Sequence, residues 1–258
     1  MKSDGALRSE SESIELSDGA ILWTITSGSG GPVILVNGGP GMADYLAPVA
    51  SLLDSDYQVY RYEQRGCGRS TGSNTLTLER FVTDLEELRE HWQIDRWFVV
   101  GHSWGVDLAL AYALSHPERL HGLIGLSGGR IHNDRVWKQI YDQRKHTEAL
   151  PPAAAPPNRD VNQALNEDWN AFCRAPDLLR RLKNLPVAVS FIYGQLDVRP
   201  SWPTEQLSQL LPAAEFFFLE RADHNLWQRN PDTLQTQMRQ FLTTCQSTQN
   251  RLTAPASD

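Results

Sequence analysis

The sequence has few cysteines and no long apolar run. Three cysteines occur in 258 residues, far apart and odd in number, so they suggest neither a disulfide framework nor a zinc site. No apolar run approaches the length that crosses a membrane, and the polar start MKSDGALRSESES lacks the apolar segment of a signal peptide. We therefore expect a cytoplasmic protein with no bound metal and no membrane partner.

The sequence also has no long run of residues with charge of one sign. The chain has 24 Lys and Arg residues against 31 Asp and Glu residues, a formal net charge of −7. Binding to nucleic acid or to anionic lipid needs a basic surface, so we expect neither partner. A small molecule or a short peptide is the expected substrate, and the sequence does not indicate an oligomeric state.

What is present is the alternation of elements typical of an α/β fold. With 40% hydrophobic residues, the chain can bury a large core in one domain. Two strand-like runs meet at Asp18-Gly19, a strong hairpin signal, and further apolar runs then alternate with helical ones. This order predicts a mostly parallel central sheet with helices on both faces. The expected core covers 12–129 and 184–246, between polar tails at 1–11 and 247–258.

One segment, 130–183, breaks this alternation. It is helical and polar, and the Pro- and Ala-rich stretch PPAAAPP interrupts it. The chain returns to a strand only at Pro186-Val187. An excursion of this length between two strands is typical of a small helical cap inserted in the core.

The stretch WFVVGHSWGVDLALAYAL predicts a strand, a sharp turn and a helix around Ser103. This is the context of a nucleophile elbow, in which Gly101 and Gly105 leave room for the reversal of the chain. The turn places Ser103 at the N-terminus of the helix, where the dipole and free amides favour an oxyanion. The pattern G-x-S-x-G also occurs in ordinary turns, so the assignment depends on finding partners for the serine.

A serine hydroxyl needs a histidine base that a carboxylate orients, and in this arrangement the chain order is Ser, Asp or Glu, His. Asp197 follows the strand-like run VAVSFIYG, and His224 follows EFFFLE just before the last helix. An alternative role for Asp197 is to cap the next helix. Asp223 is a second candidate for orienting His224, but it cannot easily orient its own neighbour in the chain. We therefore predict a triad of Ser103, Asp197 and His224, with His102 on the underside of the elbow.

The stretch VILVNGGPG places a glycine-rich corner after an early strand. Acyl transfer needs a second backbone donor beside the N–H of Trp104, and it comes from such a loop. The N–H of Gly39 can approach an oxyanion without obstruction, while Pro40 stiffens the corner. We predict an oxyanion hole formed by Gly39 and Trp104. Without the elbow and its two partners, the same corner would be interpreted as a tight structural turn.

Five segments resemble the proline iminopeptidases, which are serine peptidases of the α/β-hydrolase fold. They are NGGPG at 37–41, YEQRGCGRS at 62–70, GHSWGVDLALAYALSHPERL at 101–120, YGQLDVRP at 193–200 and ADHNLWQRNP at 222–231. The family usually has His at position 37 and Asp at position 63. The resemblance implies the same triad and oxyanion hole and no metal or organic cofactor. It also implies removal of an N-terminal residue, typically proline, from a short peptide or amide.

The cap is where the resemblance places substrate specificity. The family's longer cap carries acidic residues that bind the free α-amino group of the substrate. Here Glu167 and Asp168, in NEDWNAF, are the nearest counterparts, although carboxylates on a cap helix are more often simply solvated. Trp137 and Trp169 either line the pocket or pack the cap on the core.

The loop YEQRGCGRS has no P-loop lysine and is therefore a weak phosphate signal. We interpret it as a structural turn that braces the oxyanion loop. In this interpretation Glu63 and Arg65 form an ion pair.

Three functions remain compatible with these residues. The first is a serine hydrolase that releases N-terminal residues from peptides or amides, and the second is a carboxylesterase or lactonase with the same triad. The third is a binding protein on a hydrolase scaffold, against which the intact triad argues. An epoxide hydrolase or dehalogenase would need Asp at the elbow, and Ser103 excludes both.

Overall fold

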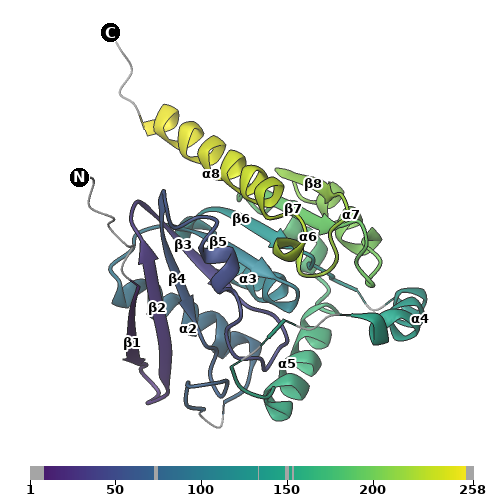
Figure 1. Ribbon diagram of the computed structural model, residues 1–258, viewed down its shortest axis with the longest axis horizontal. Coiled ribbons are helices and arrows are strands. Elements are labelled where there is room, and N and C mark those ends of the chain that lie inside the picture. The colour runs from purple at the N-terminus through teal and green to yellow at the C-terminus, as the bar shows by residue number, and fades with distance from the viewer. Residues whose placement is uncertain (1–8, 73–74, 133, 149–150, 153, 254–258) are drawn as a thin grey trace.

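The computed structural model describes residues 9–72, 75–132, 134–148, 151–152 and 154–253. In these residues eight strands form one sheet in the order β1-β2-β4-β3-β5-β6-β7-β8 (Figure 1). The strands are β1 (Glu10–Glu15), β2 (Ile21–Gly28), β3 (Gly31–Val36), β4 (Tyr57–Tyr62), β5 (Trp97–His102), β6 (Leu120–Leu126), β7 (Val189–Gly194) and β8 (Ala214–Leu219). The α-helices are α1 (Ala47–Ala50), α2 (Leu78–His91), α3 (Trp104–Ser115), α4 (Arg135–Arg144), α5 (Arg159–Phe172), α6 (Leu178–Lys183), α7 (Trp202–Leu210) and α8 (Pro231–Thr253).

The sheet begins with the predicted hairpin and continues as a parallel sheet. β1 and β2 pair antiparallel, with Ile14 opposite Leu22, and the N–H of Leu16 donates to the carbonyl of Ala20 at 2.8 Å across the turn. β2 pairs antiparallel with β4, and every other strand pairing is parallel. The predicted α/β class with a mostly parallel sheet is confirmed.

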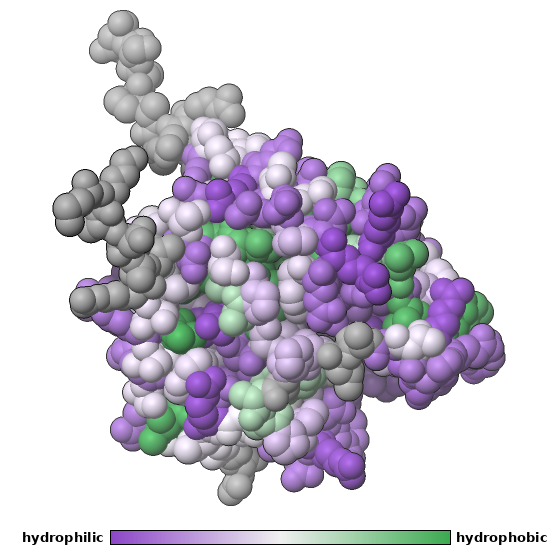
Figure 2. Space-filling view, viewed as in Figure 1, coloured by the Kyte–Doolittle hydropathy of each residue, from purple (hydrophilic) through white to green (hydrophobic). Residues whose placement is uncertain are grey.

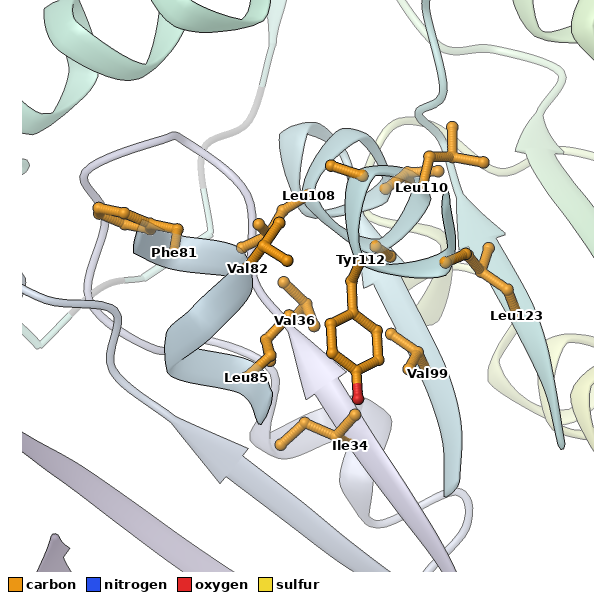
Figure 3. Packing of buried hydrophobic residues seen from close by; sticks show 14 of the residues in the cluster. Ile34, Val36, Phe81, Val82, Leu85, Val99, Leu108, Leu110, Tyr112 and Leu123 are labelled. Carbon is orange, nitrogen blue, oxygen red and sulfur yellow. The ribbon is translucent and has the colours of Figure 1, made fainter. Parts of the chain in front are cut away.

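The core lies on both faces of this sheet. Along β3, Ile34 and Val36 join the apolar cluster on one face, whereas Val33 and Leu35 join the cluster on the other. This division follows from the two-residue period of a strand. Figure 3 shows the first cluster, in which Leu85 of α2 lies near Ile34 and Val36. A sheet that is buried on both faces leaves its loops at the strand ends as the place for chemistry.

The predicted cap, 130–183, contains the helices α4, α5 and α6. Figure 1 shows α5 beside α2, with α4 projecting from the rest of the molecule. The N–H of Asn158 donates to the carbonyl of Gly41 at 2.8 Å, and the indole N–H of Trp169 donates to the carbonyl of Arg130 at 3.0 Å. These bonds fasten α5 to the loop that follows β3 and to the start of the cap itself.

Regular structure extends further toward both ends of the chain than the predicted core does. β1 begins at Glu10 and pairs with β2 although its first residues are polar, because ladder hydrogen bonds need no apolar side chain. α8 continues to Thr253, seven residues beyond the predicted end of the core. Residues 1–8 and 254–258 lie outside the described residues. The face of the molecule in Figure 2 is mostly hydrophilic, with small separate apolar patches.

The predicted ion pair between Glu63 and Arg65 is wrong. The buried guanidinium of Arg65 instead bonds Asp84 of α2 at 2.6 Å and Asp18 of the hairpin turn at 2.8 Å. Glu63 pairs with Arg69 at 2.8 Å, because the glycine-rich turn returns the chain to it. Each buried charge thus has an opposite partner, as burial requires. Within the described ranges, no helix is long and apolar enough to cross a membrane.

Candidate active site

Ser103 is the single residue between β5 and α3, and its backbone is left-handed, with φ at 55°. A residue with a side chain keeps such a conformation only where its surroundings impose it. A methyl group added at Gly101 would lie 2.5 Å from the carbonyl oxygen of Gly105, and one at Gly105 would lie 2.1 Å from that of Val36. Only glycine fits at either position, and the turn that results carries Ser103 to the start of α3.

Asp197 and His224 come from the loops after β7 and β8, and both are buried. The Oδ2 atom of Asp197 lies 2.7 Å from Nδ1 of His224. Burial opposes ionisation of Asp197, but the imidazole of His224 and the guanidinium and N–H of Arg199 hold the pKa of this carboxyl below its usual value. The ionised carboxylate accepts a hydrogen bond from the Nδ1–H of His224, which leaves Nε2 unprotonated and available as a base.

No hydrogen bond joins the hydroxyl of Ser103 to His224 among the described residues. In free enzymes such bonds are often long or poorly aligned and tighten when the substrate binds. The rings of His224 and His102 lie 4.7 Å apart, which places the base directly beside the elbow. Ser103, Asp197 and His224 therefore follow the carboxyl ends of β5, β7 and β8, at one end of the sheet.

Ser103 opens into a cavity of about 530 Å³. Gly39 and Trp104, the residues predicted for the oxyanion hole, line the same cavity. So do Trp137 and Trp169 from the cap. The volume suits a small molecule or a dipeptide-sized group.

The structure does not bring Glu167 and Asp168 to this cavity, so their predicted role as an ammonium-binding pair does not fit. Oε1 of Glu167 accepts a hydrogen bond from Gln163 at 3.0 Å and borders a separate hollow on the outside of α5. Oδ2 of Asp168 accepts the N–H of Leu78 at 2.8 Å, at the N-terminus of α2. The cavity side of α5 carries asparagines, at 162, 166 and 170.

Glu148 is a carboxylate near the base that the sequence did not reveal. Its Oε1 lies 4.0 Å from Nε2 of His224. Arg199 holds it in place through two bonds to its carboxylate, at 2.7 and 3.1 Å. Glu148 lies in an irregular stretch of the cap, where neither periodicity nor a motif marks a residue, so only the fold brings it to His224.

Asp107 is a second carboxylate that sequence reasoning missed. It lies one helical turn after Ser103 on α3 and lines the cavity. Burial raises the pKa of Asp107 to about 7, against the opposing effect of Arg130 and of the N–H groups of Arg130 and Gly129. The i, i+4 spacing from Ser103 was the available signal. Within the described parts of the chain, no three His, Cys, Asp or Glu side chains are grouped to hold a metal ion.

The chain is similar to known proteins both in sequence and in fold. Residues 31–214 match the family model of the alpha/beta hydrolase fold. The chain is 36% identical over 143 residues to the proline iminopeptidase of Heyndrickxia coagulans. These residues make up 54% of this chain and 46% of that protein. It is 39% identical over 119 residues to the proline iminopeptidase of Arabidopsis thaliana, which covers 44% of this chain and 31% of that protein. The chain thus spans less than half of these curated relatives.

Solved structures show the same fold over nearly the whole chain. A thermophilic esterase from Thermogutta terrifontis superposes with a TM-score of 0.73 at 20% identity, over 92% of this chain and 99% of that chain. The proline iminopeptidase of Mycobacterium smegmatis superposes with a TM-score of 0.71 at 19% identity, over 92% of this chain and 98% of that chain. At these identities the likeness concerns the fold, which is common to proteins of different activity.

Proposed function

The chain belongs to the α/β hydrolase fold family, and on this basis we propose that it is a serine hydrolase that releases N-terminal residues from short peptides or amides. The observation that carries the proposal is the 2.7 Å contact between Asp197 and His224 beside the Ser103 elbow. The similarity to proline iminopeptidases supports the substrate class. The reaction needs neither a metal ion nor an organic cofactor.

In the proposed reaction, Oγ of Ser103 attacks the substrate carbonyl carbon while Nε2 of His224 takes the hydroxyl proton. The carbonyl oxygen becomes an oxyanion, which accepts hydrogen bonds from the N–H groups of Gly39 and Trp104. The imidazolium then gives its proton to the leaving amine as the C–N bond breaks. Water attacks the resulting acyl-enzyme by the same steps, and Asp197 stabilises the imidazolium in both halves.

Glu148 supports an N-terminal residue as the substrate. In such a substrate the ammonium nitrogen is two bonds from the attacked carbonyl carbon, so it must lie close to Nε2 of His224. Glu148 places a carboxylate 4.0 Å from that nitrogen. A charge-assisted hydrogen bond between carboxylate and ammonium would hold the N-terminal residue over Ser103.

The alternative is a carboxylesterase or lactonase that uses the same triad on small esters. The pairing of Glu148 with Arg199 favours it, because both carboxylate oxygens already accept hydrogen bonds. An uncharged ester has no ammonium for Glu148 to bind. The two substrate classes therefore differ in how much they depend on this one side chain.

A parallel assay of a proline arylamide and a short-chain nitrophenyl ester separates these readings. We expect Ser103→Ala to abolish turnover of both substrates. Glu148→Gln keeps the size of the side chain and one acceptor oxygen for Arg199 but removes the negative charge, so we expect KM to rise at least ten-fold for the arylamide, about 1.4 kcal/mol, and to change little for the ester. An active Ser103→Ala protein contradicts the serine mechanism. Equal effects of Glu148→Gln on the two substrates favour the esterase.

We also propose a cytoplasmic location. Cys67, Cys173 and Cys245 are all free, as is usual in a reducing compartment.

A further inference from the structure

Behind the elbow, a chain of buried hydrogen bonds joins three of the loops that form the site. The N–H of Gly38 donates to the hydroxyl oxygen of Tyr45 at 2.8 Å. That hydroxyl lies 2.7 Å from Nδ1 of His102. Nε2 of His102 lies 3.0 Å from the backbone carbonyl oxygen of His224. From this geometry we infer that Tyr45 and His102 are positioning residues, which hold the oxyanion loop and the loop of the base at the correct distance from Ser103.

We call this chain of hydrogen bonds, from Gly38 through Tyr45 and His102 to the carbonyl of His224, the relay. The position of each proton in the relay follows from what each hydrogen-bond partner can donate or accept. The carbonyl oxygen of His224 can only accept, so Nε2 of His102 must carry a proton and donate it. Nδ1 of His102 is then the acceptor for the hydroxyl proton of Tyr45. The hydroxyl oxygen of Tyr45 in turn accepts the N–H of Gly38. Every donor has one acceptor, so a single tautomer of neutral His102 satisfies the chain.

A charged His102 would break this order. A second ring proton, on Nδ1, would point at the hydroxyl oxygen of Tyr45 and leave the hydroxyl's own proton without this acceptor. The surroundings oppose that state, because burial and the neighbouring ring of His224 hold the pKa of His102 well below its usual value. His102 therefore serves as a fixed connector and not as a second base.

The relay acts at the points where small displacements affect the reaction. Gly38 precedes Gly39, the proposed oxyanion donor, and it is packed so closely that an added methyl group would lie 2.7 Å from Cβ of Ser103. The other end of the relay is the backbone of His224 itself. A shift of about 1 Å at a reacting group can lower a rate about 100-fold. The relay thus fixes donor, nucleophile and base relative to one another.

Packing also holds these rings, and the experiment must separate it from the hydrogen bonds. The indole of Trp227 stacks on Tyr45 with ring centroids 6.2 Å apart and meets His102 edge-on at 4.9 Å. Tyr45→Phe keeps this packing and removes one oxygen atom. Tyr62→Phe is the matched control, because Tyr62 is also buried and its hydroxyl has no hydrogen-bond partner in the described residues.

The first test rests on the proposed function and uses whichever of the two chromogenic substrates the wild-type protein hydrolyses. We expect Tyr45→Phe to lower kcat about 10- to 100-fold with KM within about two-fold of wild type. Tyr62→Phe should leave both constants unchanged. A Tyr45→Phe protein with wild-type kcat, or equal losses in the two Phe variants, overturns the relay. An active Ser103→Ala protein, or equal effects of Glu148→Gln on the two substrates, would count against the proposed function and not against the relay, so the two failures are distinguishable.

The second test asks whether the donor of His102 matters more than its volume. His102→Gln can present an amide N–H near the position of Nε2, whereas His102→Phe fills a similar space without any donor. We expect His102→Phe to lower kcat at least ten-fold more than His102→Gln, at matched far-UV circular dichroism. Equal kcat values in the two folded variants would show that the ring only fills space and would overturn the inference.

Discussion

Two regions of the molecule meet at the cavity, and they are held in different ways. Around Ser103 the backbone itself is fixed, since Gly101 and Gly105 allow no added atom. In the cap, α4 buries none of its residues and is attached through side chains such as Trp137, whose indole N–H donates to the carbonyl of Pro200 at 2.9 Å. Changes on α4 should therefore affect substrate specificity more than the positions of the reacting groups.

The largest expected effect tests the fixed region. Asp197→Asn should lower kcat by about 10³ to 10⁴, because an amide N–H directed at His224 would favour the tautomer with its proton on Nε2. The unfolding temperature should change little, whereas kcat falls strongly. Steady-state kinetics and a thermal melt of the same preparation measure both. An Asp197→Asn protein as fast as wild type would remove Asp197 from the triad.

The next effect concerns the stability of the elbow. Gly105→Ala should lower the free energy of unfolding by about 3 kcal/mol or more, because the new methyl group overlaps the carbonyl of Val36. Ala164→Gly, on α5 of the cap, should cost only about 1 kcal/mol from helix propensity. Denaturant titrations of the two variants compare the regions directly. Equal losses would show that the backbone of the elbow is no more constrained than that of the cap.

Asp107 makes the stability of the protein depend on pH. Its pKa rises from 3.8 to about 7 on folding, so the native state binds the proton more tightly than the unfolded state. This group therefore destabilises the protein as pH rises from about 4 to 7, by up to about 1.4 kcal/mol for each pH unit. We expect the stability of Asp107→Asn relative to wild type to increase over that range. A constant difference between the two unfolding curves would contradict the role of burial at Asp107.

The smallest effect lies on the outer side of the cap. Asp168→Ala should lower the free energy of unfolding by about 1 kcal/mol, because the N–H of Leu78 loses its acceptor at the start of α2. Neither kcat nor KM should change for an arylamide substrate. A large rise in KM in this variant would return Asp168 to the substrate site.

The features that the sequence could predict are those that local residue patterns determine. The elbow, its two partner loops and the order of Ser103, Asp197 and His224 rest on glycine spacing and chain order, which are local properties of the sequence. The partners of Glu63 and Arg65 and the direction of Asp168 depend on how elements pack in three dimensions. α5 has polar residues on the cavity side and on the outer side, so its periodicity did not show which side faces Ser103.

Covalent labelling tests most directly whether Ser103 is the nucleophile. A fluorophosphonate should react with Oγ of Ser103, forming an O–P bond as fluoride leaves and the hydroxyl proton passes to His224. Intact-mass spectrometry with peptide mapping should find one adduct, on Ser103, in the wild-type protein and none in Ser103→Ala. An unlabelled wild-type protein, or a label on another residue that persists in Ser103→Ala, would contradict the account.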